Sequence, residues 1–408
     1  MISKPSNLFL VFSLFIVFLL LLPIYEVNYE FSAFAYIFLF FCFFSAYVGL
    51  FLGEIILSPK NSYHENKDEK YNVNFVFNVI LLLSILGTLL FIFELFVNRG
   101  LSLSFQITTN KIIWLNYNPN LFSAFTAFLN SFTIFLIPVY LQRKKINNKK
   151  NYLYLIIIIF LIQLIFFFIL GSRIVIFLYI IFSILSYFIF NKLNILNTAF
   201  LIICVLVLIF LSGVIFNLRL VETDINLYLS LLYSNYTFVV SPSDYVLEKL
   251  DKSFFFTSLY SVYLYLIHGF YECLYMFDYS TTFMEYGKNI LWLPLKIISL
   301  FVDLNFEINR FNLRSGVFQT FIRPIYLDFK FLSPLIIFIL FFLLSVPFSL
   351  LIKNKINWFC CLLVSYVWII SSPILSPFNS GPYSYYLVCS IIIAFFYVQK
   401  KIKNSDNS

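Results

Sequence analysis

Arginine is the residue type in this sequence best suited to bind a phosphorylated ligand. A guanidinium group keeps its charge at any accessible pH and binds phosphate oxygens through two parallel hydrogen bonds. Arg310 and Arg314 are four positions apart, so on a helix they share one face and repel each other unless an anion lies between them. We therefore expect a phosphate- or pyrophosphate-binding site. Its candidate residues are Arg173, Arg219, Arg310, Arg314 and Arg323.

For each arginine the simpler alternative is an ion pair with a nearby acidic residue. Arg173 lies in the tight break Gly171-Ser172-Arg173 between two apolar stretches, and Glu94 is its candidate partner. A charge at such a boundary is tolerated at some cost, which makes it a functional candidate by default. Arg99 is expected to act only as an end-cap whose side chain snorkels to the membrane surface.

Tyrosines and acidic residues gather in residues 217–331, which hold 12 of the 29 tyrosines. Each of these tyrosines has an ordinary interpretation as a membrane-belt residue. Together they also suit carbohydrate, because flat rings pack on sugar faces and carboxylates accept hydrogen bonds from hydroxyl groups. The candidate sugar-binding residues are Tyr263, Tyr271 and Glu272. Arginines for a diphosphate beside tyrosines for sugar indicate a lipid-diphosphate-linked oligosaccharide as the ligand.

The composition excludes a water-soluble enzyme. Of the 408 residues, 62% are hydrophobic and 11% charged, and the mean hydropathy is +0.93, whereas soluble chains carry about 25% charged residues. The net charge of +8 comes from short basic runs between apolar segments, so no nucleic-acid partner is indicated. Five of the six cysteines fall in apolar runs, there are two histidines and no CxxC motif, and we expect neither a metal site nor a disulfide framework.

The elements that must position these residues are membrane-spanning helices. Apolar segments of about 20 residues match the hydrocarbon thickness of a bilayer, and backbone groups in lipid must bond within their own segment. We predict an all-α polytopic transmembrane bundle of ten spans, or twelve if 254–277 and 290–302 also cross. Polar residues interrupt 254–277, which is expected to lie at the interface or to dip into it. The ten segments lie near 7–23, 31–53, 73–97, 119–141, 152–170, 173–190, 195–216, 332–352, 357–372 and 384–398.

The distribution of basic residues predicts the topology. With both termini cytoplasmic, the short cytoplasmic segments carry 15 basic residues and the short outer segments three. Fourteen of 20 lysines are then cytoplasmic, whereas six of seven arginines face outward, where topology does not require them. The chain divides into spans one to seven (1–216), a large, partly helical extracytoplasmic loop (217–331), and the last three spans with a short tail (332–408).

This architecture resembles the O-antigen polymerase family, the Wzy-type oligosaccharide repeat-unit polymerases of bacterial surface polysaccharide. The closest local match runs from Arg314-Ser315-Gly316 through Arg323-Pro324 to Leu327-Asp328-Phe329, leading from the large loop into the next span. Lys330 departs from the family pattern, which usually has glycine there. The Gly-Ser-Arg turn at 171–173 is similar to the family's short outer turn between two spans.

The resemblance implies a membrane glycosyltransferase of the bacterial cytoplasmic (inner) membrane. It would move a growing glycan from undecaprenyl diphosphate onto the terminal hydroxyl of a new lipid-linked repeat unit, on the outer face of the membrane. Its partners would be undecaprenyl-diphosphate-linked oligosaccharide, membrane lipid, a chain-length regulator and a flippase. No cofactor is expected, and no DxD motif for a metal is present.

The implied mechanism gives roles to the candidate residues. The diphosphate is a good leaving group, and arginines aimed at its bridging oxygen stabilise the charge that develops there. His268 is the candidate base for the attacking hydroxyl, because imidazole titrates near neutral pH. A lone histidine in an apolar stretch is more often structural. Asp328 is the second catalytic candidate, and Asp278, Glu272 and Asp303 are alternatives.

Two other functions stay open. A ligase that moves a finished glycan onto lipid A core would share the arginines and the large loop. A lipid-linked oligosaccharide flippase or other transporter is a different class, which typically places charges and broken helices near the midplane and repeats its halves. The sequence has no internal repeat and almost no mid-span charge, which favours an enzyme.

Overall fold

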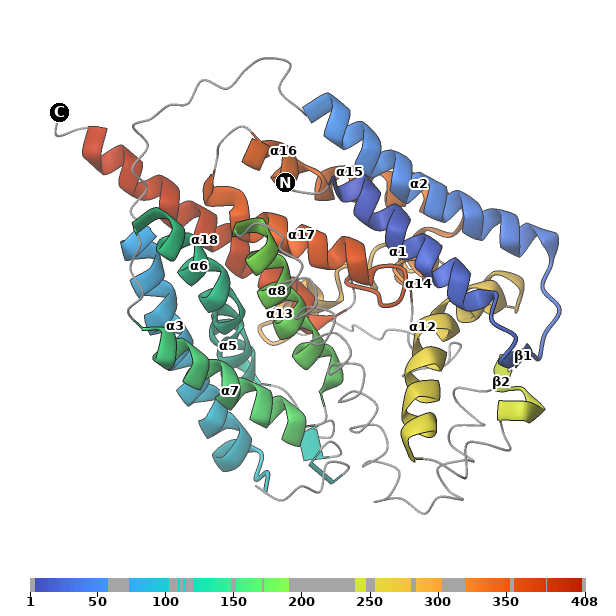
Figure 1. Cartoon of the computed structure of the whole chain (residues 1–408), viewed down its shortest axis with the longest axis horizontal. Helices are drawn as coiled ribbons and strands as arrows, with labels where there is room; N and C mark the ends of the chain where they lie inside the picture. Colours follow the sequence, from blue (N-terminus) through green and yellow to red (C-terminus); the bar gives the residue numbers. More distant parts are fainter. Residues whose placement is uncertain are drawn as a thin grey trace.

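The computed structural model describes the chain as an α-helical protein with one small β-ribbon (Figure 1). The described residues are 4–57, 73–102, 109–110, 113–114, 120–147, 152–170, 172–190, 239–246, 254–279, 284–302, 320–352, 356–378 and 380–405. The predicted all-α class agrees with these residues. The span predicted at 195–216 lies outside them.

Four helical stretches are long and apolar enough to cross a membrane. They are α2 (Ala33–Leu57); α3 (Val73–Phe93) with the π-helical turn Glu94–Asn98; α5 (Leu121–Asn130) with the 3-10 segment Ser131–Phe135 and α6 (Leu136–Asn147); and α14 (Ile322–Phe329), the 3-10 turn Lys330–Leu332, α15 (Ser333–Leu344) and α16 (Val346–Ile352). Shorter apolar helices accompany them: α1 (Pro5–Leu20), α7 (Leu153–Ile169), α8 (Arg173–Phe190), α17 (Phe359–Ser371, after the 3-10 turn Ile356–Trp358) and α18 (Gly381–Ser405). The chain is thus a membrane protein by its helices, and ten spans stays a prediction.

Apolar side chains surround these helices on all sides, which is why they are stable in lipid rather than in water. On α2, Phe40 is 65% exposed, and on α3, Leu82 is 66% exposed. Because lipid tails are as apolar as these side chains, helix association depends on close packing and on polar contacts between helices. Gly49 and Gly53 let α2 approach α15 at the backbone: a Cβ on Gly49 would lie 2.5 Å from the carbonyl oxygen of Phe338.

Helix α17 is the centre of the bundle, and each of its residues is buried. On one side α17 contacts α1. Helix α1 packs on α2, and α15 lies along α2. On the other side α17 contacts α8 and α18, next to α3, α5, α6 and α7 (Figure 1). Two groups of helices therefore flank one buried helix.

Segments predicted to share the outer side of the membrane lie at one end of the bundle. β1 (Tyr25–Val27), between α1 and α2, pairs antiparallel with β2 (Val240–Pro242). The backbone N–H and hydroxyl of Ser32 donate to the carboxylate of Asp278, at 2.6 and 2.5 Å. The N–H of Phe321, before α14, donates to the carbonyl of Ser372 after α17, at 3.0 Å. The described parts of these connections therefore contact one another in pairs at this end of the bundle.

The opposite end of the bundle joins segments predicted to be cytoplasmic. Arg143 Nε donates to Asn74 Oδ1 at 2.9 Å, and the hydroxyl of Tyr397 donates to Gln142 Oε1 at 2.6 Å. Contacts at both ends are thus compatible with the predicted alternation of the spans.

Three described helices belong to residues 217–331 and the boundary that follows: α12 (Phe254–Tyr279), α13 (Trp292–Ile298) and α14. Helix α12 packs against α1, α2 and α14. The described parts of this region therefore rest on the helix bundle instead of standing apart from it.

Candidate functional site

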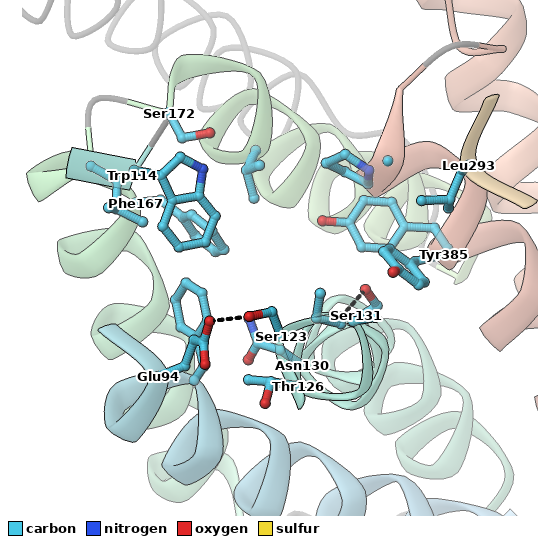
Figure 2. A pocket seen from close by; sticks show the side chains of 18 of the residues that line it. Glu94, Trp114, Ser123, Thr126, Asn130, Ser131, Phe167, Ser172, Leu293 and Tyr385 are labelled. Atoms are coloured by element: carbon cyan, nitrogen blue, oxygen red, sulfur yellow. Dashed lines mark hydrogen bonds between the residues drawn. The ribbon is translucent and has the colours of Figure 1, made fainter. Parts of the chain in front are cut away.

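A cavity of about 370 Å³ lies at the predicted outer end of the second helix group. Its walls come from the ends of α3, α5, α7 and α18, from the start of α8, from Trp114 and from α13 (Figure 2). Aromatic rings stand on both sides of it, with Trp114 and Phe167 facing Tyr385 across the space. Polar side chains of α5 form its lower wall. A concave site with rings and a few converging polar groups is the usual form of a small-molecule site.

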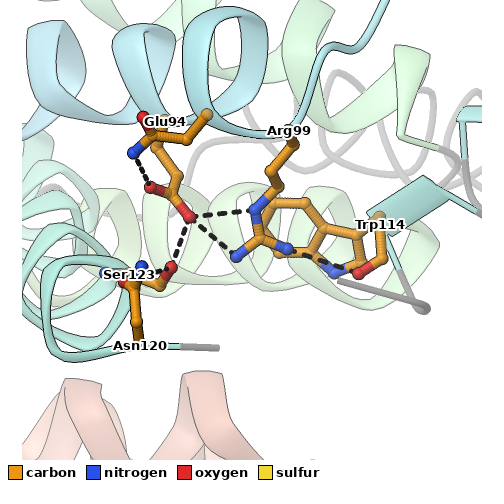
Figure 3. A network of polar contacts seen from close by, with 6 residues as sticks. Glu94, Arg99, Trp114, Asn120 and Ser123 are labelled. Atoms are coloured by element: carbon orange, nitrogen blue, oxygen red, sulfur yellow. Dashed lines mark hydrogen bonds and ion pairs between the residues drawn. The ribbon is translucent and has the colours of Figure 1, made fainter. Parts of the chain in front are cut away.

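A buried ion pair forms one wall of this cavity (Figure 3). Arg99 Nε and one terminal guanidinium nitrogen each lie 2.9 Å from the same oxygen of Glu94, and both side chains are almost fully buried. Ser123 donates its hydroxyl proton to that oxygen at 2.5 Å, and Asn98 donates to the other at 2.9 Å. The guanidinium carbon lies 3.8 Å from the ring centroid of Trp114. Arg99 is therefore not the mere end-cap that the sequence analysis expects: it is the described ion-pair partner of Glu94.

The π-helical turn Glu94–Asn98 explains how this pair forms. The turn is closed by a backbone hydrogen bond: the N–H of Arg99 donates to the carbonyl of Glu94, five residues back, at 3.1 Å. In an α-helix, residues five apart point about 140° away from each other. The wider turn brings them towards one side, and such turns are frequent at functional sites.

Below the cavity, an amide network joins three helices. Asn130 and Gln163 exchange hydrogen bonds through their carboxamides at 3.1 and 2.7 Å, and Gln163 also donates to Thr88 Oγ1 at 2.9 Å. Thr133 and Tyr179 hydrogen-bond through their hydroxyls. All these groups are buried, so they fix α3, α5, α7 and α8 relative to one another.

A second polar cluster brings together three residues predicted for the site. On α12, His268 Nε2 lies 3.2 Å from Glu272 Oε1, one helical turn away. Cys273 Sγ lies 2.9 Å from the hydroxyl of Thr320, and Arg323 is close enough to act electrostatically on that thiol. Burial raises the pKa of Cys273 to about 11, although the Thr320 hydrogen bond and Arg323 lower it.

Close packing places this cluster between α12 and the start of α14. A Cβ on Gly269 would lie 3.3 Å from the side chain of Thr320. His268, Glu272 and Arg323 are 1%, 3% and 3% exposed. The three side chains are therefore gathered in one place and enclosed by protein.

Asp328 lies at the end of α14 and is fully buried. Its carboxylate accepts hydrogen bonds from the backbone N–H and side-chain amide of Asn289 at 3.1 and 2.9 Å, and from the N–H of Ile290 at 2.9 Å. These contacts hold the turn before α13, which is a structural task.

Tyr263 and Tyr271 are buried on α12 and join it to the end of α1 and to the connection between α1 and α2. The hydroxyl of Tyr263 donates to the carbonyl of Leu19 at 3.0 Å, and that of Tyr271 lies 2.6 Å from the hydroxyl of Tyr25. Burial raises the pKa of the Tyr271 phenol above its usual range. Both side chains therefore have a structural role, because they hold α12 against the N-terminal segment of the chain.

The remaining predicted residues are only partly described. Arg173 begins α8, directly after Ser172 on the cavity wall. Arg219, Arg310 and Arg314 lie outside the described residues. The sequence analysis missed the cavity residues of α5, although the polar positions of that otherwise apolar helix were a signal. Within the part that the structure describes, no group of three or more His, Cys, Asp or Glu side chains is placed to hold a metal ion.

Comparison with protein-family models, with curated proteins and with solved structures finds no match to this chain.

Proposed function

We propose that this protein is a membrane glycosyltransferase that polymerises lipid-linked oligosaccharide repeat units of a bacterial surface polysaccharide. The growing glycan leaves undecaprenyl diphosphate and joins the terminal hydroxyl of a new lipid-linked unit. The reaction takes place at the outer face of the bacterial inner membrane, with both termini of the chain in the cytoplasm.

The observation that carries this proposal is the cavity at the predicted outer end of the bundle. Its rings suit the faces of sugars, and its serine and asparagine side chains suit sugar hydroxyls. Arg173 begins α8 beside this cavity, and most of the other arginines are predicted on the same side of the membrane. A diphosphate leaving group needs cations aimed at its developing charge, and arginine meets that need without a metal.

Arg323, His268 and Glu272 have a supporting place in this proposal. Because the three lie together where α12 meets α14, a movement between these helices exposes a cation, an imidazole and a carboxylate at once. In that open form His268 takes the proton of the attacking hydroxyl. Asp328 stays out of the chemistry and holds the turn that its carboxylate caps.

The test is the length of the surface glycan in cells that lack the protein or carry Arg173→Ala. Loss of a polymerase leaves glycans with a single repeat unit. Arg143→Lys is the matched control, because Arg143 lies at the opposite end of the bundle and should leave chain length unchanged. Full-length glycans that are not transferred to lipid A core would point to a ligase. Lipid-linked units that never reach the outer face would point to a transporter.

A further inference from the structure

Helix α13 has two different faces. One face, with Trp292, Leu293, Lys296 and Ile297, lines the cavity. The other carries Ile298, 47% exposed, and is continued by Phe301, 70% exposed. The helix is therefore a thin wall, with the cavity on one side and an uncovered apolar surface on the other.

The bilayer is the occupant that fits this uncovered surface. The cavity beneath α13 is built from the ends of apolar helices, so α13 lies at the level where those helices leave the hydrocarbon region. Short apolar helices at this level lie in the interface with one side in the lipid. Lys296, whose ammonium group lies 4.9 Å from the ring centroid of Trp292, belongs with that ring to the cavity side and not to the uncovered side.

The wall is fastened at one end. The turn before α13 is held by the Asp328 carboxylate, and backbone N–H groups of Glu285 and Tyr286 donate to the carbonyls of Leu327 and Asp328 at 3.1 and 3.3 Å. Tyr286 and Gly287 adopt positive φ angles of 50° and 89°. These contacts fix the start of α13 against the end of α14.

The size and lining of the cavity define the group that fits inside. About 370 Å³ is near the lower end of the range of small-molecule sites, roughly 300–1,000 Å³. It admits a compact head group and leaves no room for a long acyl or prenyl chain. The Glu94 and Arg99 charges offset each other, and Lys296 is a further charged side chain among the lining residues. The rest of the described lining consists of rings, apolar side chains and hydrogen-bonding groups, which suit a sugar.

We propose that this cavity binds the sugar head group of an amphiphile dissolved in the bilayer, and that the head group passes α13 to reach it while the apolar chain stays in the lipid. The identity of the natural ligand as a lipid-linked glycan rests on the proposed function. The site for a sugar-headed amphiphile follows from the geometry of α13 and the cavity, and its test needs no polymerisation.

The test is protection of a cysteine in the cavity wall from a maleimide. Ser172→Cys is the reporter, and Tyr245→Cys, 63% exposed at the same end of the bundle but away from the cavity, is the control. The five described native cysteines are buried, and Cys204 is replaced by serine. The protein is held in nanodiscs of phosphatidylethanolamine and phosphatidylglycerol. The probes are dodecyl maltoside, maltose and dodecylphosphocholine.

Dodecyl maltoside should protect the reporter and not the control. At about ten times its dissociation constant, labelling slows about tenfold, because only the unoccupied fraction reacts. Maltose should need a far higher concentration, and Trp114→Ala should weaken the protection. Equal protection by dodecylphosphocholine would reduce the cavity to a general apolar site and overturn the proposal. Protection by maltose at the same concentration would overturn passage from the bilayer, and no protection by any probe would overturn the site itself.

A bridge across the wall tests the passage directly. Leu293→Cys and Tyr385→Cys face the cavity from α13 and α18 (Figure 2), and a bis-maleimide joins them. This protein keeps the native Ser172, and binding is measured with radiolabelled dodecyl maltoside. The bridged protein should lose most of this binding, whereas protein treated with a monofunctional maleimide of equal size at Leu293→Cys alone should keep part of it. Unchanged binding after bridging would show that α13 is not on the route.

Discussion

Removing Arg99 from its partner Glu94 is the most direct test of the described site. The two side chains are 6% and 2% exposed, so Arg99→Met leaves a carboxylate enclosed by protein, with Ser123 and Asn98 as its remaining donors among the described residues. Breaking a buried pair from one side costs about 3–5 kcal/mol. The lost contact with the Trp114 ring adds up to about 2 kcal/mol in a desolvated site. The variant should therefore be strongly destabilised.

The double variant Arg99→Met/Glu94→Gln should recover much of this loss. The double variant leaves no unpaired charge at this position, and the glutamine side-chain oxygen can still accept the hydrogen bond from the Ser123 hydroxyl. We expect the two single effects to exceed the double effect by about 2–3 kcal/mol, since contacting residues couple on this scale. Unfolding in mixed micelles with rising dodecyl sulfate, followed by tryptophan fluorescence, measures each free energy of unfolding.

The matched control is Arg143→Met with Asn74→Ala. Arg143 is also buried and lies 4.5 Å from the centroid of the Phe77 ring, but its partner is a neutral carboxamide. Its coupling energy should be about 1 kcal/mol or less. The argument from an unpaired buried charge is refuted if the changes in free energy of unfolding at Glu94 and Arg99 are additive. It is also refuted if the coupling energy between Arg143 and Asn74 is as large as that between Arg99 and Glu94.

Three further predictions concern packing, the anchored turn and the arginines. Gly49→Leu should lower the yield of folded protein sharply, because a Cβ at this position would lie 2.5 Å from the carbonyl oxygen of Phe338. Gly381→Ala should be tolerated, because a Cβ there meets open space. Size-exclusion profiles of the two variants test both expectations. Asp328→Ala should cost about 1–3 kcal/mol through unpaired donors and raise proteolysis within 284–302, and an unchanged cleavage pattern would contradict the anchoring role. Arg314→Lys should shorten the surface glycan almost as much as Arg314→Ala does, because an ammonium group cannot form the two parallel hydrogen bonds of a planar guanidinium group. Full-length glycan in the lysine variant would show that only the positive charge at this position matters.

The sequence predicted the apolar helices well because their signal is local. The segment expected at 173–190 is α8 with the same bounds, and 73–97 matches α3 and its π-helical turn within a residue. Length and hydropathy are enough to predict such helices, since the thickness of the bilayer sets how many apolar residues a helix needs to cross it. The kink at Lys330, with a φ of 49°, was not predicted, because a positive φ at lysine has no sequence signal of its own.

The candidate site was harder to predict because its residues meet through tertiary contacts. Glu94 and Arg99 are five positions apart, and on an α-helix this spacing points the two side chains to different sides, so spacing alone does not predict their ion pair. One extra residue in the turn changes that geometry. Asp328 was a candidate catalyst by type and place, but its donors come from Asn289 and Ile290, which no spacing rule connects to it.

The connection between α17 and α18 links the cavity with the buried His268 cluster. At one end, the Ser372 carbonyl accepts from Phe321, next to Thr320. At the other end, Gly381 and Tyr385 line the cavity. The same connection therefore contacts the start of α14 at one end and meets the cavity lining at the other, so two sites that the sequence separates by about 50 residues are joined by one short segment whose inner end is fixed to the buried helix α17.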